Sequence, residues 1–398
     1  PWKALGNALG LVGGTWDEWG RKALIFGFKV SWSVLGVVVV GAIRRMSSST
    51  LAQPATQKPR IRPYDIAKGI AILLVVAAHQ ESMDPLFRRL VFSFHMPFFF
   101  LANALFVDKD YDVRRTFIRS LRTLALPYAA VCLLQVLLKG MLTPEHTKLA
   151  MLHRLQTAVT GMSFSGVLFP DWRSVSLIWF VACLFVARNV YALCRRAALK
   201  APRSVQYAAP LVLCLVGWWL GTQRWYLPWS ADVALFAQVF MLVGDEARRS
   251  GLLERRPSVS TVVFAVAAWV TLATGGFQIE MATRSYRGGM ACVVGACAGS
   301  IIVLWVAEYL DRAGSLVAGG VADHLAKVLM WLGRNSMVVL AIHCLRRQWA
   351  NWSSGVKSFS SAYDWVGNAC IEILFCIAVC FVYQRAKARL RAMRAGVC

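Results

Sequence analysis

The sequence predicts an all-α integral-membrane protein in which about ten transmembrane helices are bundled around a polar channel. Of its 398 residues, 58% are hydrophobic and 16% are charged, whereas a soluble domain is about 45–50% apolar and about 25% charged. The apolar residues gather in runs long enough to cross a bilayer. The net charge of +24 lies mainly between those runs, which is typical of cytoplasmic membrane loops and not of a nucleic-acid-binding domain.

The residues before the first span divide into two segments. Residues 1–45 contain an apolar run, 23–43, and we expect either an extra helix or sequence that is not native to the protein, with a slight preference for the second. Residues 46–64 contain Ser, Thr and Pro and are expected to form a cytoplasmic N-terminal segment. The multi-helix domain is expected over 65–384, followed by a basic cytoplasmic tail at 385–398.

Ten apolar runs are candidate membrane spans. If the segment that begins at Met46 is cytoplasmic, the inner loops carry about twice as many Lys and Arg side chains as the outer loops, so both termini are predicted to be cytoplasmic. The longest connection, 140–175, is then expected outside the membrane. The candidate spans are 65–80, 90–107, 123–139, 176–194, 207–221, 227–245, 259–275, 290–309, 328–345 and 365–384.

The first span contains two ionisable side chains, Lys68 near its start and His79 at its end. Their separation of 11 residues, at about 100° per residue, returns to within about 20° of the same helix face. At about 1.5 Å rise per residue the two groups are about 16 Å apart. Because ionisable groups are costly at membrane depth, they usually face a wet interior and mark a functional path. The alternative is that the two residues form no site: the Lys68 side chain would reach toward the membrane surface, and His79 would simply lie at the end of the helix.

Two further histidines, His95 and His343, are predicted near the same outer end of the bundle as His79. Three histidines at one depth favour a polar chamber over three unrelated core contacts. Asp232 and Trp179 lie near that end, and we expect them and His343 to contact the substrate. A three-histidine metal site is the less favoured alternative, because no supporting set of Asp or Glu is evident; no metal is expected. The cysteines form no CxxC pair and are expected to pack as small apolar side chains.

Arg115, Arg119 and Arg122 precede the third span at the spacing i, i+4, i+7, which places them on one face of an α-helix. A row of guanidinium groups at a membrane mouth can bind the phosphates of a ligand through forked hydrogen bonds. The alternative is an anchor that contacts anionic membrane lipids. The residues alone leave both interpretations open.

A series of motifs follows in one order along the chain: DIAKGIAILLVVAAH, FSFHMPFFFLANALF, RSLRTLALPY, LIWFVACLFV and LGRNSMVVLAIH. In this order and spacing the chain resembles the acyltransferase 3 family over about residues 60–385. Members of this family are integral-membrane O-acyltransferases that modify glycans. The similarity is greatest to the polysaccharide and fucose O-acetylase branch, which includes bacterial exopolysaccharide (xanthan-type) acetyltransferases. The resemblance therefore implies a multi-pass protein of a bacterial inner membrane.

The resemblance implies catalytic roles for residues of the first two motifs. His79 would act as general base, with Lys68 at the position where many members have Arg, and His95 would assist. The GRNS motif at 333–336 has a looser role. No Ser or Cys stands beside a base as an activated nucleophile, so direct transfer is expected rather than an acyl-enzyme.

The resemblance also implies acetyl-CoA as the acyl donor. Arg119 and Arg122 match the family's RxxR motif, which handles the donor, and Arg115 and Lys68 would join them in binding its phosphates. The stripe from Lys68 to His79 then becomes a donor channel through the bundle. The expected acceptor is a sugar hydroxyl of an exopolysaccharide or of its lipid-linked precursor, and the surrounding partners are membrane lipids.

Two alternatives stay open. One is a multi-helix transporter of a polysaccharide intermediate, which usually shows an internal repeat and broken helices at matching places, and neither is evident here. The other keeps the fold and uses a larger acyl group, such as succinyl. The acceptor sugar, its hydroxyl, the membrane face of acylation and the oligomeric state are not fixed by the sequence.

Overall fold

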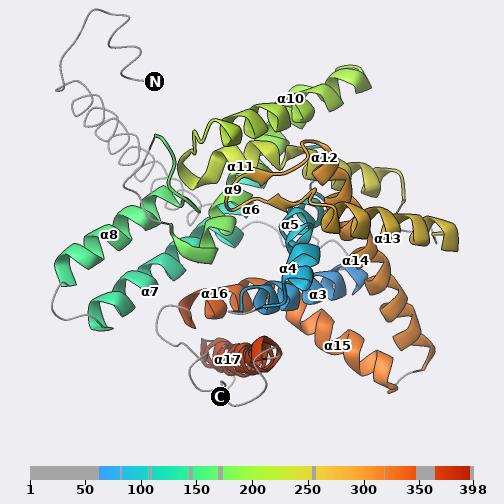
Figure 1. Cartoon of the computed structure of the whole chain (residues 1–398). Helices are drawn as coiled ribbons and strands as arrows, with labels where there is room; N and C mark the ends of the chain where they lie inside the picture. The colour runs from blue at the N-terminus through green and yellow to red at the C-terminus, as the bar shows by residue number, and fades with distance from the viewer. Residues whose placement is uncertain are drawn as a thin grey trace, which may run out of the picture. The chain divides into compact units, whose positions relative to one another are not determined.

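The described part of the chain is almost entirely helical (Figure 1). The computed structural model describes residues 62–80, 83–105, 107, 110–142, 147–168, 174–252, 257–317, 319–346 and 364–394. All of them belong to one structural unit, Ile61–Cys398. The expected segment 1–45 lies outside the described residues, as does 46–64 except for its last three positions. The expected tail at 385–398 begins as a continuation of the last helix.

The first half of the described chain contains, in order, α3 (Arg62–Ala78), α4 (Pro85–Phe92), α5 (His95–Ala104), α6 (Val113–Ser120), the π-helical segment η1 (Leu121–Ala125), α7 (Leu126–Leu142), α8 (Thr147–Thr160), η3 (Ser176–Ile178) and α9 (Trp179–Ala197). The second half contains α10 (Arg203–Thr222), η4 (Pro228–Ser230), α11 (Ala231–Phe236), α12 (Gln238–Arg249), α13 (Val259–Thr274), β1 (Ile279–Glu280), β2 (Ser285–Tyr286), α14 (Ala291–Leu316), α15 (Val321–Arg334), α16 (Ser336–Arg346) and α17 (Asp364–Arg394).

Five stretches of helix in the described residues are long and apolar enough to cross a membrane, and the bent pair α15 and α16 makes a sixth if it is one span. Each of the ten predicted runs contains helix, but ten spans are not confirmed. The run 90–107 is divided between α4 and α5, and the run 227–245 between η4, α11 and α12. The qualifying stretches are Val113–Val136, Ser176–Ala197, Arg203–Thr222, Ala291–Leu316 and Asp364–Ala386.

The ninth predicted span, 328–345, is not one straight helix, because the chain bends by 70° between α15 and α16. Asn335 lies at the break with φ −107° and ψ 13°, outside the helical region. Its side-chain amide donates a hydrogen bond to the carbonyl of Trp331 at 2.9 Å. A short amide side chain that bonds nearby backbone competes with helix continuation, so the helix ends here.

Helix α3 and helix α15 cross with their backbones in close approach. A Cβ added to Gly333 would lie 1.7 Å from the carbonyl oxygen of Asp65, and one added to Gly69 would lie 2.0 Å from that of Leu329. Only glycine fits at either position, because no side-chain atom can come so near to backbone. The α15 contact fixes one side of α3, which leaves another side of the helix to line the interior.

Local caps explain where the short helices begin. The Asp84 carboxylate accepts a hydrogen bond from the backbone N–H of Phe87 at 2.8 Å, and Pro85 occupies the first position of α4. The Asp112 carboxylate accepts in the same way from the N–H of Arg115 at 2.8 Å and starts α6. These caps place the turns that precede the two short helices.

Two elements lie where the sequence predicted only connections. Helix α8 occupies part of 140–175 and packs on α7, where the Tyr128 hydroxyl donates to the carbonyl of Ala158 at 2.6 Å. The hairpin β1–β2 pairs Glu280 with Ser285. Strands of two residues leave no periodic signal in a sequence, and α8 is too polar to resemble a span, so neither was found.

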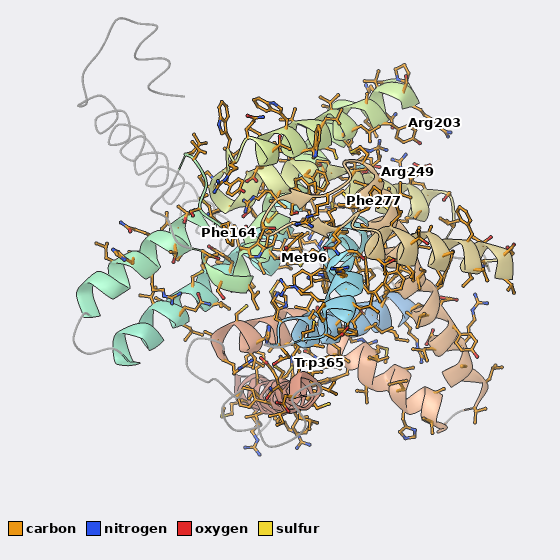
Figure 2. The ribbon with its side chains drawn as sticks, in the orientation of Figure 1. Met96, Phe164, Arg203, Arg249, Phe277 and Trp365 are labelled. Carbon is orange, nitrogen blue, oxygen red and sulfur yellow. The ribbon has the colours of Figure 1, made fainter. Side chains whose placement is uncertain are left out.

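Arginine side chains gather at one end of the helices α9, α10 and α12. Figure 2 shows Arg203, at the start of α10, and Arg249, at the end of α12, on the same side of the molecule. The hydroxyl of Tyr207 on α10 donates to the Glu246 carboxylate on α12 at 3.1 Å, which confirms that these two ends are neighbours. The neighbouring ends of these helices are therefore basic.

Candidate active site

A cavity of about 440 Å³ runs along one face of α3. Lys68, Ile72, Val75 and His79 all line it, which is one helical stripe with the spacing i, i+4, i+7 and i+11. The predicted common face of Lys68 and His79 is therefore present, with about 16 Å of helix between them. One continuous space connects the two groups.

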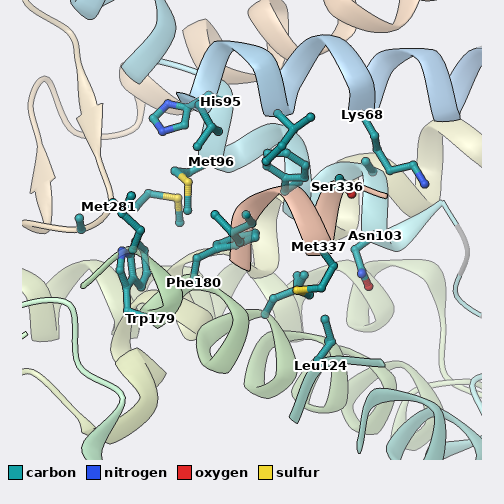
Figure 3. Close-up of a pocket in the computed structure, with 18 of the residues that line it drawn as sticks. Lys68, His95, Met96, Asn103, Leu124, Trp179, Phe180, Met281, Ser336 and Met337 are labelled. Carbon is teal, nitrogen blue, oxygen red and sulfur yellow. The ribbon is translucent and has the colours of Figure 1, made fainter. Parts of the chain in front are cut away.

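The other walls come from α5, α9, α16 and the hairpin. Figure 3 shows Lys68, Asn103 and Ser336 toward one end of the cavity, and His95 and Trp179 toward the other. Apolar side chains lie between the two polar ends, and they include Phe99, Leu124, Phe180, Leu184, Met337 and Leu340. The space suits an elongated ligand with an apolar middle portion.

The end that contains Lys68 is basic. Arg119, Arg188 and Arg334 also line the cavity, so it has four cationic side chains. The Asp65 carboxylate accepts from the Lys68 ammonium at 2.8 Å and from Nε of Arg334 at 3.1 Å, and it offsets part of this charge. An excess of guanidinium and ammonium groups suits an anion such as a phosphate group.

The imidazole of His79 is oriented by its own helix. Its Nδ1 lies 2.7 Å from the carbonyl oxygen of Val75. Since a carbonyl oxygen only accepts hydrogen bonds, Nδ1 carries the proton, and the neutral ring has its basic lone pair on Nε2. His95 has the same arrangement, with Nδ1 2.9 Å from the carbonyl of Val91. The two ring centroids are 6.2 Å apart.

His343 lies beside His79 but does not line the cavity. Its ring centroid is 5.9 Å from that of His79, and its Nδ1 lies 2.5 Å from Oε1 of Glu372, where both groups are fully buried. The same carboxylate accepts from Nε of Arg346 at 2.9 Å and from the side-chain amide of Gln80 at 2.7 Å. Glu372 thus ties the residue next to His79 to α16 and α17.

Two other expected substrate contacts differ in their placement. Trp179 lines the cavity at its histidine end. Asp232 does not line it; both its side chain and that of Arg284 are fully buried, and its carboxylate accepts from Nε of Arg284 at 2.7 Å. That ion pair anchors the hairpin, because Arg284 lies in the turn between β1 and β2 with a positive φ of 58°. Asp232 therefore holds the hairpin and does not face the cavity.

The three expected donor-binding arginines do not share one α-helical face. All three side chains are exposed, but only Arg119 is among the residues that line the cavity. Arg122 lies in η1, which is a π-helical segment, and a π-helix has more residues per turn than an α-helix. The α-helical spacing therefore applies to Arg115 and Arg119, which both lie in α6, and does not extend unchanged to Arg122.

Sequence reasoning missed several residues of the site. Arg188 lies within the apolar run 176–194 and Glu372 within 365–384, and an ionisable residue inside such a run is a signal that could have identified both. Asn103 and Glu280 had no comparable signal, because a tertiary contact alone brings them to the cavity. Within the part of the chain that the structure describes, no group of three His, Cys, Asp or Glu side chains has the arrangement of a metal site.

A family model described as an acyltransferase domain matches residues 63–385. The match begins in α3 and ends in α17, so it contains both histidines of the cavity and all four of its cationic side chains. Neither the curated proteins nor the solved structures give a match to the chain.

Proposed function

The chain belongs to the acyltransferase 3 family, and we propose that it is a membrane O-acetyltransferase that moves an acetyl group from acetyl-CoA to a sugar hydroxyl. The proposed acceptor is an exopolysaccharide or its lipid-linked precursor. Family membership favours this function over a transporter, and the apolar helices suggest a multi-pass membrane protein.

One observation supports this proposal above all others. A single cavity reaches from the basic side chains Lys68 and Arg119 to the imidazole of His79. An acyl-CoA has phosphates at one end and a thioester at the other, joined by a long, weakly polar arm. The charges, the apolar walls and the histidines follow one another in the same order along the cavity.

The cationic end would hold the donor. Arg119 and Arg334 present planar guanidinium groups that bind phosphate oxygens in pairs, and Lys68 adds a point charge. Arg122, the other member of the RxxR motif, lies at the same helix turn and would contact the more exposed part of the nucleotide. The arm would then lie against Ile72 and Val75 and bring the thioester beside His79.

His79 would act as general base. Its Nε2 takes the proton of the sugar hydroxyl while the sugar oxygen attacks the thioester carbonyl carbon. The tetrahedral intermediate collapses, the carbon–sulfur bond breaks, and the protonated imidazole returns its proton to the leaving thiolate. The products are the O-acetylated sugar and CoA. His95 would orient the incoming hydroxyl by accepting a hydrogen bond at its own Nε2.

The network behind His79 would keep the base in position. Glu372 binds Gln80, which follows His79 in the chain, and it also binds His343 beside the His79 ring. A catalytic group whose neighbours are fixed is held closer to its reactive geometry, which lowers the entropy cost of the transition state. We therefore assign positioning roles to Glu372 and His343.

The test combines glycan analysis with donor binding. Cells that lack the chromosomal gene are complemented with wild type, His79→Ala or His324→Ala, and the host glycan is examined by mass spectrometry. His324 is exposed on α15 and lines neither cavity described here, so its substitution is the matched control. We expect His79→Ala to lower acetylation at least about 100-fold while the purified variant still binds radiolabelled acetyl-CoA. Acetylation by His79→Ala at the level of His324→Ala would refute the role of His79 as general base. A wild type that binds no acetyl-CoA would refute acetyl-CoA as the donor.

A further inference from the structure

A second cavity of about 510 Å³ adjoins the first at His79. It shares several lining residues with the first cavity, and both have His79 in their walls. The shared residues are His79, Phe92, Leu177, Trp179, Glu280 and Ala282. The proposed base therefore stands at the junction of two spaces, and only one of them leads to the basic end.

The walls of the second cavity are held firmly. The hairpin turn and the segment after α8 are joined where the Ser163 hydroxyl donates to the carbonyl of Ala282 at 2.7 Å. Arg284 donates to the same hydroxyl and forms the buried ion pair with Asp232. Tyr226 lies under the Arg284 guanidinium at 4.2 Å from its ring centroid. This space is a built feature of the fold, because buried polar contacts define two of its sides.

The chemical lining differs sharply between the two cavities. Two charged side chains, Arg88 and Glu280, line the second cavity together with His79. They form an ion pair with each other at 3.4 Å. The rest of its polar lining consists of uncharged side chains: Ser163, Ser174, Ser176, Thr283 and Gln80. The first cavity, in contrast, is lined by four cations: Lys68, Arg119, Arg188 and Arg334. Among the described residues, the lining of the second cavity therefore has no excess charge to attract an anion.

Aromatic rings complete the second cavity. Phe92, Phe164 and Trp179 line it, and the Arg88 guanidinium lies 4.5 Å from the centroid of the Phe92 ring. Aromatic faces take the apolar C–H face of a sugar ring, and hydroxyl groups and paired charges supply hydrogen bonds to its edge. This combination matches a neutral carbohydrate better than it matches a nucleotide or an acyl chain.

We propose that the second cavity binds the acceptor, and that it selects an uncharged sugar unit over an acidic one. Donor and acceptor would then meet at His79, and Glu280, which lines both cavities, would contact the acceptor next to the reacting hydroxyl. This inference rests on the proposed function, because it takes the first cavity as the donor site.

The first test fills the second cavity and leaves the first open. Thr283→Trp adds a large side chain in the hairpin turn, and Arg287→Trp places the same side chain on the exposed part of the hairpin, outside both cavities. Purified proteins are assayed with acetyl-labelled CoA and a panel of n-octyl glycosides of glucose, mannose and galactose. We expect Thr283→Trp to raise the acceptor KM at least tenfold with acetyl-CoA binding unchanged, and Arg287→Trp to behave as wild type.

A second readout protects the test against a misfolded variant. Thr283→Cys and Arg287→Cys are labelled with a maleimide, and labelling at each position is followed by mass spectrometry. The glycosides should slow labelling at Thr283→Cys and not at Arg287→Cys, and acetyl-CoA should protect neither. Equal protection at both positions, protection by acetyl-CoA alone, or no protection by any glycoside would overturn the assignment.

The preference of the second cavity for an uncharged sugar is tested separately. Glu280→Gln leaves the Arg88 guanidinium without its carboxylate, so the variant should accept n-octyl glucuronide better, relative to n-octyl glucoside, than wild type does. An unchanged or lower ratio would refute selection by charge. If the wild type does not bind acetyl-CoA, the proposed function is refuted. If the wild type binds acetyl-CoA and Thr283→Trp transfers acetyl as well as the wild type does, only the acceptor site is refuted.

Discussion

The close crossing of α3 and α15 should control the position of the catalytic stripe, and Gly333→Ala tests this. The added Cβ would lie 1.7 Å from the carbonyl oxygen of Asp65, and real Cβ atoms essentially never come nearer than 3.0 Å. The two backbones must therefore separate by roughly 1.3 Å, and α3 carries both Lys68 and His79. Overpacking of this kind costs about 1–3 kcal/mol of stability, and a misplacement of about 1 Å can cost about 100-fold in rate.

The assay compares Gly333→Ala with Gly295→Ala, both purified in detergent. In the control the added Cβ would meet the Cβ of Leu272 at 3.2 Å, which a shift of a few tenths of an ångström relieves. Acetyl transfer and thermal unfolding are measured for both. We expect Gly333→Ala to lose about 100-fold in transfer and to melt at a lower temperature. Transfer by Gly333→Ala at the level of the control would show that the crossing does not position the stripe, and the reasoning would fail.

Three further predictions follow from the same contacts. Arg119→Ala should weaken acetyl-CoA binding more than Arg122→Ala does, because Arg119 lines the cavity; equal effects in equilibrium binding would contradict the placement of the donor. Glu372→Gln leaves the buried Arg346 guanidinium without a carboxylate and should cost about 3–5 kcal/mol, seen as a lower melting temperature; an unchanged melting temperature would contradict the ion pair. Asp232→Asn should loosen the hairpin and raise the acceptor KM, with acetyl-CoA affinity as the reference; a weaker donor affinity at constant acceptor KM would count against it.

The helical stripe could be predicted because it depends only on local geometry. Lys68 and His79 belong to one helix, and helical periodicity places them on one face whatever surrounds them. The same argument does not extend directly to Arg122, because the π-helical segment changes the periodicity and leaves no mark in the sequence. The relation between α6 and the cavity therefore required the structure.

Contacts between distant parts of the chain account for most of what the sequence did not predict. Glu280 lies about 200 residues after His79, and only the folded hairpin brings it to the cavity. Asp232 was expected to contact the substrate, and the structure pairs it with Arg284 instead. Ten spans are not confirmed, because an apolar run such as 90–107 is divided between the short helices α4 and α5, and neither has the length of a span.

The bend at Asn335 gives the cavity a source of positive potential that no titratable side chain supplies. Helix α16 begins at Ser336, which lines the cavity, so the first turn of a helix meets the donor space. Peptide dipoles aligned along a helix place about half a positive charge at such an end. Part of the attraction for phosphate would therefore survive the loss of every lysine and arginine in the wall, and it would not vary with pH. Had α15 continued straight through the membrane, that end would not exist.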